Sequence, residues 1–78
     1  MNLDQVDLGS LYRVREVNAP PNSPHVKGQL EDIGFLPGEQ VTLLRKGLLG
    51  KGPYMVRVGS STFALRHSEA CLISVECS

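Results

Sequence analysis

The sequence predicts a mainly β fold, a small closed barrel of about five short strands with one short helix inserted after the first strand. Three observations support this prediction. Several short segments alternate apolar and polar residues, most clearly residues 54–58. Turns rich in Gly and Pro separate these segments, and one stretch, residues 24–33, has the spacing of an amphipathic helix. Strands this short hide their edges when the sheet closes on itself.

The expected elements follow one another without a linker, so the 78 residues are expected to form a single domain, 1–78. The helix carries an apolar stripe of Val26, Leu30 and Ile33, and Ser23 is expected to cap its start. The expected strands cover residues 11–17, 40–46, 54–58, 62–66 and 71–75, and one helical turn covers residues 67–70.

Residues 30–38 are predicted to form a compact joint between the helix and the sheet. Gly34 follows the last apolar helix position, where a residue in the left-handed conformation ends a helix. Pro37 and Gly38 fit the two central positions of a type II turn, because Pro presets φ and Gly accepts a positive φ. Phe35 and Leu36 are expected to return to the core.

Composition excludes several classes of function. Eight basic and eight acidic residues cancel, which argues against non-specific nucleic-acid binding and against an electrostatic membrane anchor. The first residues lack the basic and apolar regions of a signal peptide, and no apolar run is long enough to span a membrane. Two cysteines do not make a disulfide framework, so the expected compartment is the cytoplasm.

Residues 47–52 form a Gly-rich loop that resembles a fragment of a phosphate-binding loop. A Walker loop has four residues between its glycines and then Lys and Ser or Thr at the start of a helix, whereas a strand is expected here. The loop also lacks the flanking helices of a KH motif. Nucleotide and RNA binding are therefore not expected. The sequence shows no nucleophile paired with a base, so neither enzymatic activity nor a cofactor is expected.

The sequence offers few ligands for a transition metal. Its imidazole and thiol groups belong to His25, His67, Cys71 and Cys77, without the spacing of a structural zinc site. His67 and Cys71 would share a helical face only if the turn at 67–70 continued, whereas Cys71 is expected to begin an inward-facing strand. No metal site is therefore expected, and His67, Glu69 and Cys71 are the weak candidates.

The positive hypothesis is a surface that binds a partner protein. Leu48 and Leu49 lie between glycines in the loop, where burial of both is not expected, and Tyr54 beside them could supply an aromatic anchor. The alternative is that one leucine covers the end of the barrel as part of the core. Leu49→Ser is expected to weaken binding of the partner and to leave the thermal midpoint nearly unchanged.

The ordered set of motifs resembles the FeoA family, small cytoplasmic proteins of bacterial ferrous-iron uptake. The resemblance covers about residues 8–76 and is carried by four motifs. They are Leu30-x-x-Ile-Gly-Phe-x-Pro-Gly38, the Leu-Leu-Gly loop with Pro53, Tyr54-x-Val-x-Val-Gly59, and Phe63-Ala-Leu-Arg66 followed by Glu69-Ala70. One difference is that the family loop usually carries an acidic residue before its second proline, whereas this loop is longer and basic.

The resemblance implies an SH3-like barrel and a non-enzymatic accessory role. It implies contact with a FeoB-like membrane permease that carries a cytoplasmic GTPase domain. The protein would then be cytoplasmic and recruited to the inner membrane through this partner. The alternative is a small metal-binding sensor domain similar to the C-terminal barrel of iron-dependent repressors. Exposed strand edges and the leucine loop leave homo-oligomerisation open.

Overall fold

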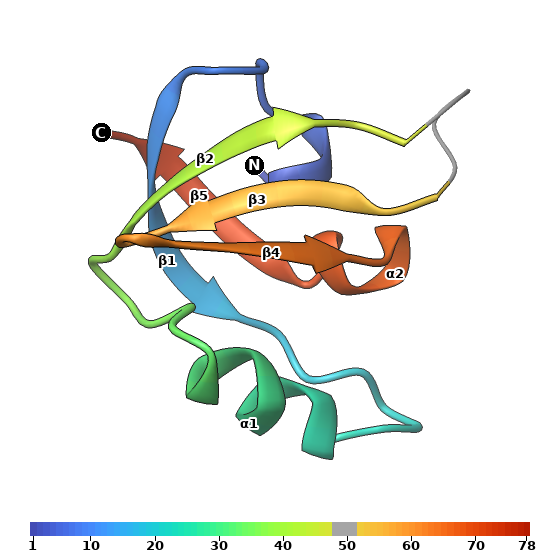
Figure 1. Ribbon diagram of the computed structural model, residues 1–78. Coiled ribbons are helices and arrows are strands. Elements are labelled where there is room, and N and C mark those ends of the chain that lie inside the picture. Colours follow the sequence, from blue (N-terminus) through green and yellow to red (C-terminus); the bar gives the residue numbers. More distant parts are fainter. Residues whose placement is uncertain (48–51) are drawn as a thin grey trace.

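The computed structural model describes residues 1–47 and 52–78 and shows one antiparallel sheet with the strand order β4-β3-β2-β1-β5 (Figure 1). The strands are β1 (Leu11–Val17), β2 (Gln40–Arg45), β3 (Tyr54–Val58), β4 (Ser61–Leu65) and β5 (Ile73–Cys77). The helices are η1 (Leu3–Gln5, a 3-10 helix), α1 (His25–Asp32) and α2 (His67–Ala70). This confirms the predicted mainly β fold with a short helix after the first strand.

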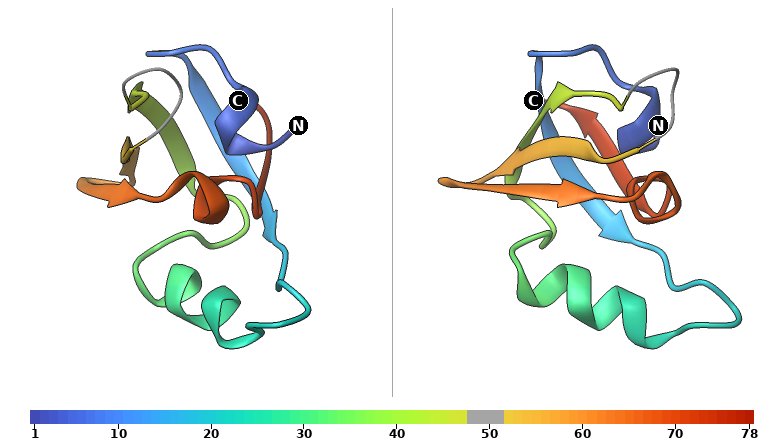
Figure 2. Two further views of the ribbon diagram at one scale, coloured as in Figure 1. Left: turned by 90° about the vertical axis from the view of Figure 1, so that its right-hand side faces the viewer. Right: turned by 45° about the vertical axis from the view of Figure 1, so that its right-hand side comes forward.

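The sheet coils strongly (Figure 2), and the buried apolar side chains form one core cluster. Register shifts between Val14 and Glu16 in the β1–β5 pair, and between Leu43 and Arg45 in the β2–β3 pair, help to bend it, because a bulge increases the local twist. Alternate residues of each strand face inward, as the sequence patterns predict. The largest fully buried side chains are Phe35, Leu3, Leu30, Leu43, Ile73, Val14, Val17, Val41, Val56 and Val75.

The joint after α1 is a full Schellman motif. The amide of Phe35 donates to the carbonyl of Leu30 and the amide of Gly34 donates to the carbonyl of Glu31, both at 3.1 Å. Gly34 has φ of 121°, and the side chains of Phe35 and Leu30 are both buried. The helix therefore ends where the sequence predicts, and the two side chains that usually accompany this motif with a hydrophobic contact both lie in the core cluster.

The turn at Pro37 and Gly38 connects the joint to the sheet. The amide of Glu39 donates to the carbonyl of Leu36 at 3.0 Å, and Gly38 has φ of 92°, as a type II turn requires. The amide of Gly38 also donates to the carbonyl of Val14 at 2.8 Å, and the amide of Val14 donates to Glu39 at 2.9 Å. The turn is thus bonded directly to β1.

The first residues of the chain lie along β5. The amide of Val75 donates to the carbonyl of Met1 at 2.8 Å, and Asn2 forms an isolated antiparallel bridge with Ser74. Leu3 follows and is fully buried. This short extended segment therefore bonds the edge of β5 that β1 leaves open, which is one way in which proteins protect an edge strand.

Two expectations about apolar residues are wrong. Ile33 is 37% exposed and Leu36 is 46% exposed, whereas both were expected to face the core. Ile33 is the C-cap of α1 with φ of −89° and ψ of 1°, so it no longer continues the helical stripe.

At the start of α1, the expected side-chain cap by Ser23 is absent. Pro24 is already helical, and the amide of Val26 bonds to the backbone carbonyl of Ser23.

The expected boundary of the last strand is also wrong. Cys71 was expected to begin it, but the backbone of Cys71 is still helical, with φ of −63° and ψ of −21°. Its amide donates to the carbonyl of His67 at 3.0 Å, and β5 begins only at Ile73. The helical turn therefore extends one residue further, which changes the surroundings of the Cys71 side chain. Among the described residues, no helix is long and apolar enough to cross a membrane.

Candidate functional site

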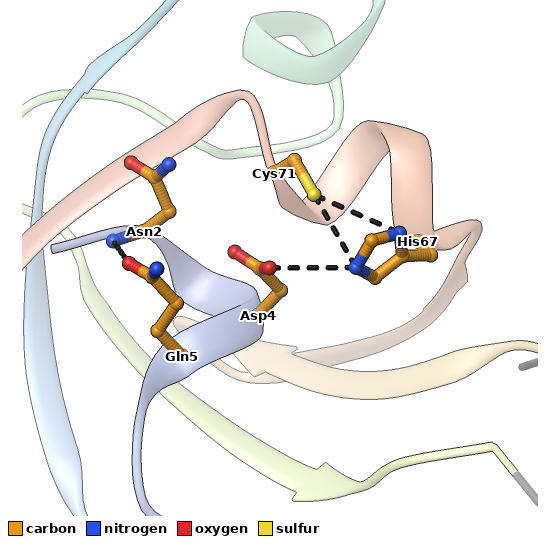
Figure 3. A network of polar contacts seen from close by, with 5 residues as sticks. All are labelled: Asn2, Asp4, Gln5, His67 and Cys71. Atoms are coloured by element: carbon orange, nitrogen blue, oxygen red, sulfur yellow. Dashed lines mark hydrogen bonds and ion pairs between the residues drawn. The ribbon is translucent and has the colours of Figure 1, made fainter. Parts of the chain in front are cut away.

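Asp4, His67 and Cys71 converge where η1 meets α2 (Figure 3). The Nε2 atom of His67 lies 3.4 Å from Oδ2 of Asp4 and 3.5 Å from Sγ of Cys71. One donor atom from each of the three side chains lies within 4.8 Å of the other two. The three residues, here called the Asp4–His67–Cys71 cluster, bring together a carboxylate, an imidazole and a thiol from opposite ends of the chain.

The backbone of α2 places His67 and Cys71 on one side. These residues are four apart, so their side chains neighbour each other while the turn stays helical. The start of α2 is fixed by Glu69, whose Oε1 accepts from the amide of Arg66 at 2.8 Å, which is half of a capping box. The ring of His67 packs against Tyr54 with a centroid distance of 5.5 Å, which restricts its orientation.

Asp4 is held opposite α2 by the segment that bonds to β5. The buried side chain of Leu3 anchors η1 on the core. The Oε1 atom of Gln5 accepts from the amide of Asn2 at 3.1 Å and closes the single turn (Figure 3). Asp4 is therefore placed by packing and backbone bonds on both sides of it rather than by its own contact with His67.

The electrostatics of the cluster favour a protonated thiol. Burial raises the pKa of Cys71, and a hydrogen bond to Asp4 and the negative charge of that carboxylate raise the pKa further. Oδ1 of Asp4 is buried and, among the described residues, has no hydrogen-bond partner. Burying an acceptor without a hydrogen-bond partner costs about 1–3 kcal/mol of folding free energy. A proton donor or a cation near Oδ1 would remove this cost.

The structure brings together two of the three weak metal candidates. His67 and Cys71 are adjacent because the turn continues to Cys71. Glu69 instead caps α2, and Asp4 takes the position of the carboxylate. Asp4 was not predicted as a ligand, because nothing in its local sequence pattern indicates contact with a helix near the other end of the chain.

The predicted partner surface lies partly outside the described residues, since Leu48 and Leu49 belong to the segment 48–51. Tyr54 is only 4% exposed and belongs to the core, which leaves little of its surface for a partner. Gly34, Pro37 and Gly38 occupy the joint described above. Within the described part of the chain, the exposed large apolar residues are Met1, Leu8, Leu11, Ile33, Leu36 and Leu44.

Leu8, Leu11 and Leu44 lie close together in the backbone register. Leu11 is opposite Thr42 in the β1–β2 pair, and the amide of Gly9, next to Leu8, donates to the carbonyl of Leu43. Leu44 is the residue at the bulge of β2. We call these three side chains the leucine surface. They are 55%, 55% and 44% exposed, respectively.

The coiled five-stranded sheet with its inserted helix defines a small SH3-like β-barrel domain. The family model of the FeoA domain matches residues 1–77 of the sequence, so the chain belongs to the FeoA family. FeoA proteins are associated with ferrous-iron transport. No curated protein gives a significant match.

Solved structures of FeoA proteins support the same family assignment. FeoA of Stenotrophomonas maltophilia, crystallised with zinc, is 34% identical with a TM-score of 0.86, over 97% of this chain and 89% of that chain. FeoA of Chlorobium tepidum is 30% identical with a TM-score of 0.83, over 99% of this chain and 70% of that chain. A manganese-dependent transcriptional repressor shares only the fold, at 19% identity and a TM-score of 0.80, over 100% of this chain and 41% of that chain.

Proposed function

We propose that this protein is a non-enzymatic, cytoplasmic accessory protein of ferrous-iron uptake that acts by contact with a FeoB-type GTPase permease. Membership of the FeoA family carries this proposal. The Stenotrophomonas relative is put forward as a bacterial ferrous-iron transport activating factor, which fits an accessory role. The partner recruits the protein to the inner membrane.

The leucine surface supports action by contact. Leu8, Leu11 and Leu44 expose apolar side chains on neighbouring segments, and such groups of residues often mark sites where proteins bind. An apolar segment of the permease is the complementary partner. The sequence-predicted leucines, Leu48 and Leu49, remain part of this proposal, and Leu49→Ser remains a test of it.

Retention of the full chain on immobilised permease tests the proposal. The purified GTPase domain and the whole permease in detergent are compared as baits. We expect Leu11→Ser to reduce the retained fraction at least about fivefold, because truncation of a hot-spot residue at the centre of an interface costs more than about 1 kcal/mol.

Leu36→Ser is the matched control, because Leu36 is a leucine of similar exposure at the joint after α1. It should leave retention unchanged. If neither bait retains the wild-type protein, the proposed contact is wrong. If Leu36→Ser weakens retention as much as Leu11→Ser, the leucine surface is not the contact.

A further inference from the structure

We propose that Asp4, His67 and Cys71 form a binding site for one divalent transition-metal ion of the zinc class. The site would join η1 to α2. The metal site does not depend on the proposed contact with the permease. Its three ligands belong to a single chain, and none of them is part of the leucine surface.

The distances between the donor atoms fit a tetrahedral ion. Zinc binds nitrogen and oxygen at about 2.0–2.1 Å and thiolate sulfur at about 2.3 Å, so tetrahedral angles place N and O about 3.3 Å apart and S and N about 3.6 Å apart. The corresponding distances from Nε2 of His67 are 3.4 Å to Oδ2 of Asp4 and 3.5 Å to Sγ of Cys71. Both distances from His67 therefore match those around a tetrahedral ion, and the ligand atoms of Asp4 and Cys71 lie within 4.8 Å of each other.

The donor set selects the class of ion. A thiolate and an imidazole together favour zinc and its neighbours in the first transition row, whereas calcium and magnesium prefer oxygen ligands alone. With three protein ligands, the fourth tetrahedral position is left for water or another small ligand. The side chain of His67 is 53% exposed, so an ion has access from solvent.

Oδ1 of Asp4 gives an independent indication. The contact of Asp4 with His67 involves Oδ2, whereas Oδ1 remains buried without a partner among the described residues. A purely structural network of side chains would leave this acceptor unsatisfied. A nearby dication offsets its burial electrostatically, because the positive charge acts on both oxygens of the carboxylate.

Binding exchanges protons for the ion. The S–H bond of Cys71 breaks, the thiolate sulfur forms a bond to the metal, and the proton goes to solvent. Neutral His67 donates its Nε2 lone pair, and the Asp4 carboxylate donates an oxygen lone pair. No oxidant or reductant is required. The bound ion would fix the beginning of the chain to α2.

Anaerobic titration of the reduced full-length chain with Co²⁺ tests this site. Co²⁺ stands in for Zn²⁺ and gives a near-ultraviolet thiolate-to-metal band together with intense visible bands in tetrahedral coordination. We expect both to saturate at one ion per chain and to disappear when Zn²⁺ is added, because Zn²⁺ binds such sites more tightly than Co²⁺. A wild-type chain that shows no thiolate band overturns the proposal.

Three substitutions assign the ligands. Asp4→Asn, His67→Gln and Cys71→Ser should each weaken Co²⁺ binding by more than about 100-fold, which exceeds the usual effect of losing an outer-shell partner. Cys77→Ser and His25→Gln are matched controls that remove an exposed thiol and the other imidazole. If the thiolate band survives Cys71→Ser and is lost in Cys77→Ser, the assignment is wrong.

A second measurement does not depend on folded variants. Addition of Zn²⁺ to the ¹⁵N-labelled wild-type chain should shift the amide signals of residues 2–5 and 67–72 and leave those of α1 in place. Shifts confined to Cys77 and its neighbours, or no shifts at all, would contradict the proposed site.

Discussion

Asp4 illustrates why part of the candidate site cannot be predicted from the sequence. The spacing of His67 and Cys71 is visible in the sequence, but whether they share a face depends on one backbone conformation, at Cys71 itself. Asp4 joins them only because the first residues bond to β5. Packing between opposite ends of a chain leaves no local pattern, so no periodicity reveals it.

The environment of Cys71 predicts low reactivity for its thiol. The thiolate is the nucleophile, so the raised pKa of Cys71 lowers its reactive fraction near neutral pH. In the reduced, metal-free chain we expect iodoacetamide to modify Cys71 more slowly than the exposed Cys77. The rate at Cys71 should increase as the pH rises toward its raised pKa, as measured by mass spectrometry of each cysteine peptide.

Asp4→Asn tests the cause of this low reactivity. It removes the charge that helps to raise the pKa of Cys71, so the pKa should fall and alkylation of Cys71 should become faster. Burial, the largest cause of the raised pKa, remains, so the acceleration should be partial. Equal alkylation rates at Cys71 and Cys77 in the wild-type chain would contradict the expected low reactivity of Cys71. The alkylation rate at Cys77 is the internal control.

At the scale of elements, the joint after α1 was predictable because it is local. Gly34, Pro37 and Gly38 each meet a conformational requirement that one or two neighbours impose, so residue type alone indicates the geometry. The exposure of Leu36 was not predictable in the same way. Its side-chain direction depends on how the turn is bonded to β1, which the sequence does not state.

Two glycines of this region should respond in opposite directions to the same substitution. Gly28 lies inside α1, and an added Cβ would meet nothing within 4 Å, so Gly28→Ala should raise the free energy of unfolding by about 0.5–1 kcal/mol. Gly34 has φ of 121°, so Gly34→Ala should lower it by about 1–3 kcal/mol. Urea unfolding followed by circular dichroism measures both changes.

The cause at Gly34 is conformational rather than steric. A Cβ there would lie 3.5 Å from Cγ1 of Val58, which is an ordinary van der Waals distance. Stabilisation by Gly34→Ala would show that the positive φ is not required. Destabilisation by Gly28→Ala would show that α1 is not continuous through this position.

At the scale of the whole molecule, alternating patterns predicted the strands but not their order. The order β4-β3-β2-β1-β5 places the last strand beside the first; the short strands predicted a closed barrel, but not this order. The segment of residues 1–2 that bonds to β5 was not predicted. Edge protection of this kind depends on which strand is left without a partner, and this is decided only when the sheet has formed.

The N-terminal segment should therefore contribute to global stability. Leu3 is fully buried, so Leu3→Ala should lower the free energy of unfolding by about 2–5 kcal/mol. Leu8 is 55% exposed and close in sequence, so Leu8→Ala should change it by less than about 0.5 kcal/mol. Thermal and urea unfolding of both variants provide the measurement. Similar losses in the two would show that the segment contributes through its length rather than through the burial of Leu3.

The bond between the amide of Val75 and the carbonyl of Met1 has a consequence for the order of folding. It joins backbone groups that are far apart in the sequence, and closing so long a loop costs conformational entropy. The β3–β4 hairpin can form early because its strands are neighbours in sequence, whereas the pairing of β1 with β5 joins distant segments and is expected to form later. Until it forms, one edge of β1 lacks its partner strand, and an open edge can pair with another chain.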